Sequence, residues 1–408
     1  MIPGFPVTSA VIYWFRNDLR LTDNPAFTHA YHLARQSAAN LHAVYVHDPK
    51  QSVETRWGFQ RMGEHRKAFL AQRLQDLASQ LKAIDCELVE LHGAPKDALS
   101  AFCESIDAKH IYCEDIAAPE EQAEVESLKA AGLEVQTLWQ SSLLEPVDLP
   151  FDVQQLPAVF TAFRNKVEKH GLKPRERLLQ TANVPESAAE KYLKHYFSGD
   201  VASTYKLTRN RLMDTTVGQP FSTKFSPWLA CGALSAPMIY AELKRFEAGR
   251  GANDSTYWIW FELLWRDYFR FLHLQHGRKL YRKQGLGGFE LAKVPNNKQG
   301  FSRWCEGKTD EPLVDAGMRE LAATGWLSNR MRQVVASYLI HDLGGDWRAG
   351  AAWFEAQLID YDVYSNQGNW LYIAGRGTDP RGGRRFNPQM QAQQHDAEGT
   401  YRRFWNKN

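Results

Sequence analysis

The sequence of 408 residues contains only five cysteines, and none of them forms a CxxC motif with another. An odd number of scattered cysteines fits a reducing compartment and argues against a zinc or iron–sulfur site. The cysteines stand at Cys86, Cys103, Cys113, Cys231 and Cys305. We therefore expect no disulfide framework and no bound metal.

Long apolar runs are missing as well. No stretch approaches the ~20 apolar residues that cross a bilayer. The first residues, MIPGFPVTSAVIYWFRNDLR, lack a basic start, and their apolar run is too short for a signal peptide. These features predict a soluble, cytoplasmic protein without a membrane partner.

The sequence also lacks a strong net charge, an internal repeat and a low-complexity tract. Its 49 Lys and Arg against 47 Asp and Glu leave a net charge of +2, so attraction to nucleic acid needs a local basic patch. The length is too great for one ordinary core and suggests two or three domains. Tryptophan, by contrast, is abundant: ten of the thirteen stand from Trp228 onward, more than a plain helical core needs.

The first 139 residues predict an α/β domain. Short apolar, β-branched runs alternate with helical patterns, which is typical of a parallel sheet covered on both faces. The expected strands are 10–15, 41–47, 86–91, 109–113 and 134–138, and the expected helices are 25–37, 58–83, 95–107 and 119–131. No GxGxxG follows the first strand, so this Rossmann-like domain is not expected to bind NAD.

The remainder of the chain predicts a larger all-helical domain over 158–408, joined through an irregular linker at 140–157. Almost nothing in it resembles a strand. The expected helices are 158–170, 186–197, 227–248, 254–276, 311–324, 326–343 and 346–359.

Polar residues are concentrated in the apolar stretch from Trp326 to Tyr372. On a helix, Trp326, Asn329 and Gln333 fall at i, i+3 and i+7 and share one face. Arg332 stands one position off that face, and Asp360, Asp362 and Asn366 follow. Buried polar groups cost free energy without partners, which favours a polar ligand here. Helix caps and one structural Arg–Asp bridge are an equally open alternative.

Two further segments carry candidate chemistry. Ser226 followed by Pro227 predicts a helix start with Ser226 as the N-cap, and Ser222, Thr223 and Lys224 precede it. Such a helix N-terminus suits a diphosphate, although an ordinary capped helix is the commoner explanation. In the helix 254–276, Trp258, Glu262, Trp265 and Phe269 share a face, where burial would raise the pKa of Glu262 or require a partner. A plain intrahelical salt bridge between Glu262 and Arg266 is the alternative.

The loop GRGTDPRGGRRFNP near the C-terminus is basic. It carries Arg376, Arg381, Arg384 and Arg385 against the single Asp379. Its glycines leave the arginines free to reach outward, which suits contacts with nucleic-acid phosphates. A solvated surface loop is the alternative.

These motifs together resemble the photolyase/cryptochrome family, and within it the cryptochrome-DASH branch. The matching segments run from YWFRNDLRLTDNPAF through STKFSPWLACGALS, ELLWRDYFRF and NRMRQVVASYLIHDLGGDWR to LIDYDVYSNQGNWLY and FNP, so they cover essentially the whole chain. The resemblance implies FAD, folded into a U shape, inside the helical domain. The implied FAD-binding residues are Tyr205, Ser222, Thr223, Lys224, Phe225, Ser226, Glu262, Arg266, Asn329, Arg332, Asp360, Asp362 and Asn366. Arg332 and Asp360 would form a buried ion pair beside the flavin ring, and Asn366 would face flavin N5.

The resemblance implies repair of cyclobutane pyrimidine dimers, chiefly in single-stranded DNA, by an electron from the excited reduced flavin. The implied catalytic residues, which surround the flipped-out dimer, are Glu262, Trp265, Asn329, Gln333 and Tyr372. Gln333 stands where dimer photolyases usually have Met, and Tyr372 where they usually have a second Trp. Both changes make the cavity more polar and point to the DASH branch. Arg381, Arg384 and Arg385 would contact DNA, and a monomer is expected.

Three further implications concern electron transfer, a second chromophore and alternative functions. Trp370 and Trp347 match the inner two members of the family's tryptophan chain, whereas the outer member has no match, and Trp353, Trp304 or Tyr338 could replace it. Glu120 or Glu121 matches an acidic residue that contacts an antenna, often methenyltetrahydrofolate. The alternative from another class is a blue-light photoreceptor that binds nucleic acid or a protein without repair. A (6-4) photolyase ranks last, because Gln333 stands where a histidine is needed.

Overall fold

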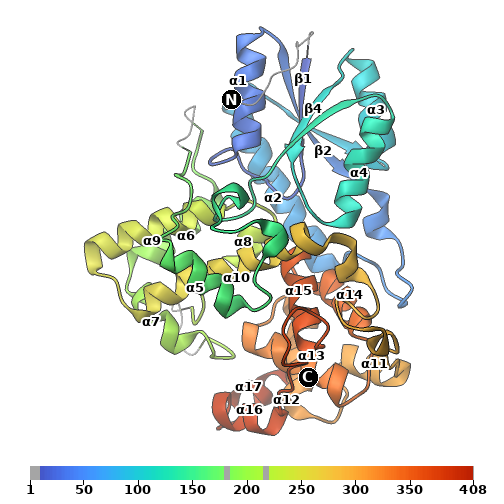
Figure 1. The fold of residues 1–408 in the computed structure, drawn as a ribbon, viewed down its shortest axis with the longest axis vertical. Helices are drawn as coiled ribbons and strands as arrows, with labels where there is room; N and C mark the ends of the chain where they lie inside the picture. Colours follow the sequence, from blue (N-terminus) through green and yellow to red (C-terminus); the bar gives the residue numbers. More distant parts are fainter. Residues whose placement is uncertain (1–9, 179–183, 215–219, 408) are drawn as a thin grey trace.

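The N-terminal part of the computed structural model is a five-stranded parallel sheet with strand order β3-β2-β1-β4-β5 (Figure 1). The structure describes residues 10–178, 184–214 and 220–407. The strands are β1 Ala10–Phe15, β2 Asn40–His47, β3 Leu88–His92, β4 His110–Glu114 and β5 Glu134–Leu138. This sheet confirms the predicted α/β class of the N-terminal part.

Helices cover both faces of the sheet, because residues of the central strand β1 alternate between two cores. Tyr13 packs with Leu77 of α2 on one face, and Trp14 packs with Leu99 of α3 and Leu128 of α4 on the other. Every residue of β1 is buried, as expected for a parallel strand between two helical layers. The helices are α1 Pro25–Gln36, α2 Glu64–Lys82, α3 Pro95–Ser105 and α4 Pro119–Ala130.

The C-terminal part is helical, and no strand occurs in it among the described residues (Figure 1). Its α-helices are α5 Phe160–Lys169, α6 Ala188–Ser198, α7 Val201–Thr208, α8 Ser226–Ala230, α9 Ala236–Arg250, α10 Asp254–His276, α11 Lys298–Cys305, α12 Pro312–Thr324, α13 Asn329–His341, α14 Trp347–Gln357, α15 Val363–Ile373, α16 Pro388–His395 and α17 Thr400–Trp405. Short 3₁₀ helices occur at Pro49–Ser52, Pro146–Asp148, Val153–Gln155, Gly277–Tyr281 and Phe289–Ala292. The sequence patterns did not predict α7, α11, α15, α16 or α17.

The single helix predicted over 227–248 is wrong, because the chain breaks between α8 and α9. Gly232 has φ +72, and a Cβ there would lie 2.0 Å from the carbonyl oxygen of Asn17. Only glycine allows this close approach to the α/β domain. Ser235 then caps α9 by accepting a hydrogen bond from the backbone N–H of Met238 (3.1 Å). Ser226 is the first residue of α8 and makes no side-chain cap, which corrects its predicted role as an N-cap.

Two other predicted helices begin too early. α2 begins at Glu64 instead of 58, since Gly63 donates its backbone N–H to the carbonyl of Ala356 in the helical part (2.8 Å). α13 begins at Asn329 instead of 326, because Ser328 accepts a hydrogen bond from the N–H of Met331 and caps the helix there.

Buried hydrogen bonds join the two parts. Asp267 of α10 accepts hydrogen bonds from the backbone N–H groups of Leu143 and Leu144, both at 2.8 Å. The hydroxyl of Tyr364 on α15 accepts from the backbone N–H of Ala117 (2.8 Å). The described helices include none that is long and apolar enough to cross a membrane. The same residues hold no cluster of His, Cys, Asp and Glu that could bind a metal.

Candidate functional site

A cavity of about 420 Å³ lies between α7, α10, α13 and α15 in the helical part. This volume is within the range of ordinary ligand pockets. Seventeen of the predicted cofactor-binding, catalytic and electron-transfer residues line it: Tyr205, Ser222, Thr223, Lys224, Phe225, Ser226, Glu262, Trp265, Arg266, Asn329, Arg332, Gln333, Asp360, Asp362, Asn366, Trp370 and Tyr372. Segments up to 167 positions apart in the sequence therefore meet at one site.

Two Arg–Asp ion pairs, each with one buried partner, border this cavity. Arg332 of α13 reaches Asp360 at 2.7 Å, and Arg270 of α10 reaches Asp362 at 2.6 Å. Burial alone would raise the pKa of Asp362, but the positive charges of Arg270 and Arg266 outweigh it and hold that pKa well below its usual range. Asp362 therefore remains ionised while it also caps α15 through the N–H of Ser365 (2.7 Å).

Arg266 pairs with backbone carbonyls instead of with Glu262. Its guanidinium donates to the carbonyl of Ser141 and to that of Leu229 (3.3 Å), which ties α10 to the linker and to α8. The alternative of an intrahelical Glu262–Arg266 bridge is therefore wrong. Burial, together with the nearby charge of Arg270, lowers the pKa of Arg266 to about 9.

Glu262 pairs with Arg209, which directly follows α7 and which the sequence patterns did not single out. The Arg209 guanidinium also lies 4.2 Å from the centroid of the Trp258 ring. Burial raises the pKa of Glu262, and the positive charge of Arg209 opposes that rise. The Glu262 side chain keeps 31% of its surface exposed and so faces the opening of the cavity.

Aromatic rings border the same opening. The Trp265 ring stacks on Phe160 at 3.8 Å and meets Tyr372 at 6.0 Å with an interplanar angle of 67°. Arg384 donates to the Tyr372 hydroxyl (2.9 Å) and so links the basic loop to this wall. A flat heterocycle entering here would meet ring faces and one carboxylate.

The loop 222–226 forms the opposite wall. Lys224 has a positive φ of 52° and holds its ammonium group 3.3 Å from the centroid of the Trp326 ring. Tyr192 fixes the loop by donating its hydroxyl to the carbonyl of Thr223 (3.0 Å). The helix behind the loop, α8, has only five residues, so its dipole is weaker than that of the long helix predicted there. The hydroxyls and Lys224 remain the anion-binding features of this wall.

The cavity suits a flat cofactor that carries both donors and acceptors. Asp360 Oδ1 and Trp326 Nε1 are buried and have no hydrogen-bond partner among the described residues. Asn366 donates its amide to the carbonyl of Ala351 (3.0 Å), which leaves its amide oxygen available. Phe269 and Leu358 add apolar surface to the same walls. Unpartnered buried polar atoms next to apolar walls fit the polar edge and flat face of a flavin ring.

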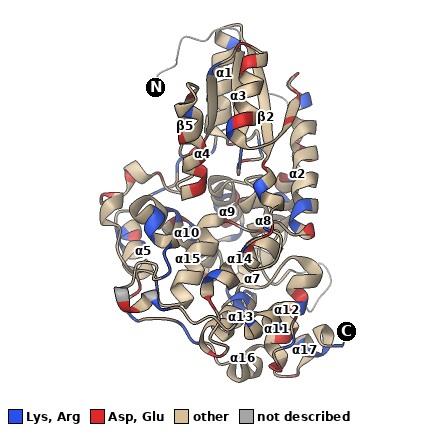
Figure 2. Ribbon diagram, turned by 90° about the vertical axis from the view of Figure 1, so that its right-hand side faces the viewer, with Lys and Arg blue, Asp and Glu red and all other residues tan. Residues whose placement is uncertain are grey.

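The four arginines of the C-terminal loop take different roles. Arg376 is buried and donates to the carbonyls of Lys283 (3.2 Å) and Leu291, so the expectation that it reaches outward is wrong. Arg381 pairs with Asp379 at 2.6 Å. Arg381 and Arg384 line a smaller cavity of about 200 Å³ that shares Trp265 and Tyr372 with the main one. Arg385 is 67% exposed beside Asp342. Elsewhere, basic and acidic residues alternate over both parts of the molecule (Figure 2).

Trp347, Glu120 and Glu121 lie outside the main cavity. Trp347 is buried and donates its indole N–H to the carbonyl of Lys283 (3.1 Å). Glu120 pairs with Arg61 at 2.7 Å, and burial raises the pKa of Glu121 on the same turn of α4.

Comparisons with known proteins agree with this geometry. The sequence model described as the FAD binding domain of DNA photolyase matches residues 258–407, and the model described as DNA photolyase matches residues 11–184. A protein of Synechocystis named "Cryptochrome DASH" is 42% identical, with 98% of this chain and 88% of that protein covered. A Xenopus laevis protein of the same name is 40% identical, with 97% and 82% covered. The chain belongs to the photolyase/cryptochrome family.

Solved structures of the family share the fold. The crystal structure of a Synechocystis cryptochrome superposes with a TM-score of 0.89 at 40% identity and covers 98% of this chain and 89% of that one. A class III photolyase from Agrobacterium tumefaciens gives a TM-score of 0.79 at 26% identity, with 99% and 88% covered. The helical part is thus an FAD-binding domain of the photolyase type, which confirms FAD as the predicted cofactor.

Proposed function

We propose that the protein is an FAD-dependent, blue-light-driven lyase that splits cyclobutane pyrimidine dimers, chiefly in single-stranded DNA, as a monomer. The observation that carries the proposal is the opening of the cavity, where the Glu262 carboxyl and the Trp265 and Tyr372 rings meet. Among the described lining residues there is no histidine, which counts against (6-4) chemistry. The DASH relatives and the class III photolyase support this reaction class.

Bound FAD would supply the light-driven electron, and the residues of this chain would hold it. The loop from Ser222 to Ser226 would bind the diphosphate through its hydroxyls and Lys224. Asp360 has an unpartnered carboxylate oxygen that could accept a hydrogen bond from the flavin ring or the sugar part of FAD. Asn366 offers its free amide oxygen in the same way. The remaining proposed ligands of FAD are Tyr205, Phe225, Glu262, Arg266, Asn329, Arg332 and Asp362.

The residues at the opening would bind the dimer. Trp265 and Tyr372 would flank its rings, and Glu262 would hydrogen-bond a pyrimidine carbonyl or N–H. Gln333 and Asn329 add amides to the same wall. Flipping a dimer out of a single strand costs less free energy than flipping it out of a stacked duplex. A polar cavity offsets less of the cost of leaving a duplex, because its polar groups must be desolvated when the dimer binds. Together these effects support the preference for single strands.

Four further assignments belong to the same proposal. Residues 1–139 form the antenna-type domain, 140–157 the linker and 158–408 the catalytic domain. Trp370 and Trp347 carry electrons to the flavin. Glu120 or Glu121 contacts an antenna such as methenyltetrahydrofolate. Arg381, Arg384 and Arg385 contact DNA phosphates, and the exposed Arg385 is the best placed of the three.

Illumination of the flavin-loaded protein with UV-irradiated oligo(dT) tests the proposal. Repair restores the thymine absorbance that dimerisation removes. We expect recovery on single strands, and a slower recovery on the same oligonucleotide paired with oligo(dA). A flavin-loaded, photoreducible protein that restores no absorbance on single strands would refute repair and favour the photoreceptor alternative.

A further inference from the structure

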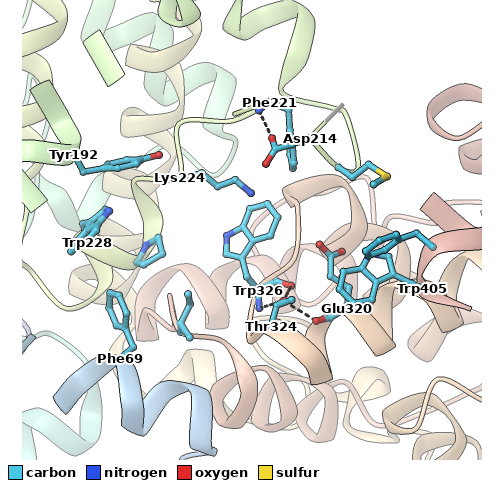
Figure 3. Close-up of a pocket in the computed structure, with 14 residues that line it drawn as sticks. Phe69, Tyr192, Asp214, Phe221, Lys224, Trp228, Glu320, Thr324, Trp326 and Trp405 are labelled. Carbon is cyan, nitrogen blue, oxygen red and sulfur yellow. Dashed lines mark hydrogen bonds between the residues drawn. The ribbon is translucent and has the colours of Figure 1, made fainter. Parts of the chain in front are cut away.

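A second cavity, of about 580 Å³, adjoins the cofactor cavity and shares two wall residues with it, Lys224 and Trp326 (Figure 3). Its other walls include α2, α6, α12 and α17, which do not reach the first cavity, and α8, which lines both. Of the residues proposed to contact FAD, the dimer or the antenna, Lys224 alone also lines it, and the three N–H donors of its ammonium can serve both ligands. The dimer-repair function therefore leaves this cavity unexplained.

Half of the fourteen residues lining this second cavity are aromatic. Tyr192 and Trp228 lie with ring centroids 6.0 Å apart, and Phe221 meets Trp326 edge-on at 5.7 Å. Figure 3 shows Phe69, Tyr192 and Trp228 on one side of the cavity and Trp405 on the other, with Trp326 between them. Aromatic walls of this kind bind flat rings by stacking, and sequence-tolerant stacking on a base contributes about 1–3 kcal/mol in nucleic-acid sites.

Three charged side chains gather around the Trp326 indole: Lys224, Asp214 and Glu320 (Figure 3). None of them forms an ion pair with another described residue, unlike Glu262, Arg332 and Asp362 in the cofactor cavity. One carboxylate oxygen of Asp214 accepts a hydrogen bond from the backbone N–H of Phe221 (2.9 Å), and Glu320 accepts one from the Tyr401 hydroxyl. The ammonium of Lys224 faces ring surfaces instead of a carboxylate.

Such groups define the hydrogen-bonding pattern of a ligand. Two carboxylates accept from N–H groups, and one ammonium donates to oxygen or ring nitrogen. Burial raises the pKa of Glu320 to about 7 and lowers that of Lys224, so both charged forms cost free energy until a partner arrives. The two acidic side chains also disfavour a phosphate deep in the cavity.

We propose that this cavity binds a flat heterocycle with a guanine-type edge. Guanine has an N–H and an adjacent amino group for the carboxylates of Asp214 or Glu320, and a carbonyl oxygen and ring nitrogen for Lys224, the pair of acceptors that lysine contacts in DNA. Its faces stack on the aromatic walls. Pterin has the same arrangement of donors and acceptors, so a guanine nucleotide and a free pterin are the two sources. Adenine is excluded, since it lacks the paired donors.

Binding to the flavin-loaded protein in the dark tests the proposal. The probes are pterin, followed by its fluorescence anisotropy, and GMP, followed by calorimetry. Lumazine and IMP are the matched controls, because each lacks the 2-amino group. Loss of that group leaves a carboxylate acceptor of the cavity unpaired, and we expect binding to weaken about tenfold. Tighter binding of pterin than of lumazine, or of GMP than of IMP, supports recognition of the guanine-type edge. The probe that binds identifies the ligand as a free pterin or a guanine nucleotide.

Variants locate the site. Asp214→Asn and Glu320→Gln should each weaken binding about tenfold, whereas Glu306→Gln, an equal charge change at an exposed acid, should not. Phe404→Ala removes a ring that is 57% exposed and so threatens the fold little, yet it should weaken stacking. Flavin content and thermal unfolding report the fold of each variant.

The proposal fails if neither probe binds more tightly than about 1 mM, if lumazine and IMP bind as well as pterin and GMP, or if all three cavity variants bind normally. Dimer repair is measured on the same samples and should be unchanged in Asp214→Asn. A protein that binds pterin or GMP but does not repair oligo(dT) would refute the proposed function and leave this site intact.

Discussion

Arg209 and Glu262 form an ion pair between the C-terminal end of α7 and α10 at the opening of the cofactor cavity. The Glu262 carboxyl is the only acidic group among the described residues that the proposed function places against the dimer. Its partner controls its charge, because burial raises the pKa of Glu262 and the Arg209 guanidinium opposes that rise. Arg209 is thus a positioning residue for Glu262.

Replacing Arg209 by Met should raise the pKa of Glu262 further, because burial then acts unopposed. The protonated carboxyl of Glu262, seen as a carboxylic C=O band in infrared difference spectra against Glu262→Gln, should persist to higher pH than in the parent. Lys206→Met on α7 is the control, since Lys206 pairs with the exposed Asp254. An unchanged titration in Arg209→Met would show that Arg209 does not set the charge of Glu262.

Glu262→Gln tests the role of the carboxyl itself. The amide keeps the shape and loses the charge and one acceptor, so we expect dimer repair to fall about a hundredfold with flavin still bound. Glu262→Ala should lose at least as much. Flavin content and the rate of repair, measured on the same preparations, separate the two roles. Loss of flavin from both variants would make Glu262 a structural residue of the cofactor cavity.

Asp362→Asn should destabilise the protein by about 3 kcal/mol near neutral pH, because the buried Arg270 loses its partner. The folded-state pKa of Asp362 lies below the unfolded value of about 3.9. The contribution of ionised Asp362 to the free energy of unfolding is therefore fully present above a pH of about 3.9. As the pH falls through the folded pKa, the contribution disappears. Urea unfolding of both proteins across acidic pH should show their difference shrinking toward low pH. A difference independent of pH would contradict this account.

Local sequence patterns predicted the range of α10, because its capping residue stands directly before it. Asn253 caps α10 and accepts from the N–H groups of Ser255 and Thr256, and the predicted range 254–276 is that of the helix. The break at Gly232 escaped prediction, because its cause is the carbonyl of Asn17 in the other domain. Short helices such as α7 carry too little periodicity to be seen.

For the cavity, too, residues close together in the sequence could be predicted, whereas contacts between distant segments could not. Residues within one motif, such as Asn329 and Gln333, could be grouped from their spacing on a helix. The Arg209–Glu262 pair joins positions 53 residues apart, so no periodicity reveals it, and spacing on the helix offered only the nearer Arg266 as an alternative partner. The only available signal was that Arg209 follows Tyr205 by one helical turn. Resemblance to a family supplied Tyr205 but not its neighbour.

Arg385→Ala should weaken binding to single-stranded DNA and reduce the dependence of log K on log salt by about 0.7, the value for one phosphate contact with a single strand. Arg385 is two-thirds exposed, so its removal should not affect folding. Fluorescence anisotropy of a labelled oligonucleotide at several salt concentrations gives both quantities. Lys96→Ala, an exposed change on α3 of the α/β part, is the control. An unchanged salt slope would exclude a phosphate contact at Arg385.

Trp370 should be essential for light-driven reduction of the bound flavin, because it is the buried tryptophan that lines the cofactor cavity on α15. We expect Trp370→Phe to slow the bleaching of oxidised flavin absorbance under illumination with an external reductant at least tenfold. Phenylalanine keeps the packing but is far harder to oxidise. Flavin content and dark binding should remain normal.

The next carrier is a choice between two tryptophans. Trp304 lies edge-on to Trp370, with centroids 6.4 Å apart, and donates its indole N–H to the carbonyl of Val335 (2.9 Å). Trp347 matches the family's chain and bonds to the carbonyl of Lys283. If electrons follow the family's route, Trp347→Phe slows flavin reduction and Trp304→Phe does not. Slow flavin reduction in Trp304→Phe with a normal rate in Trp347→Phe would place the route through Trp304. Normal rates in both single variants, with slow reduction only in the double variant, would show two parallel routes from Trp370.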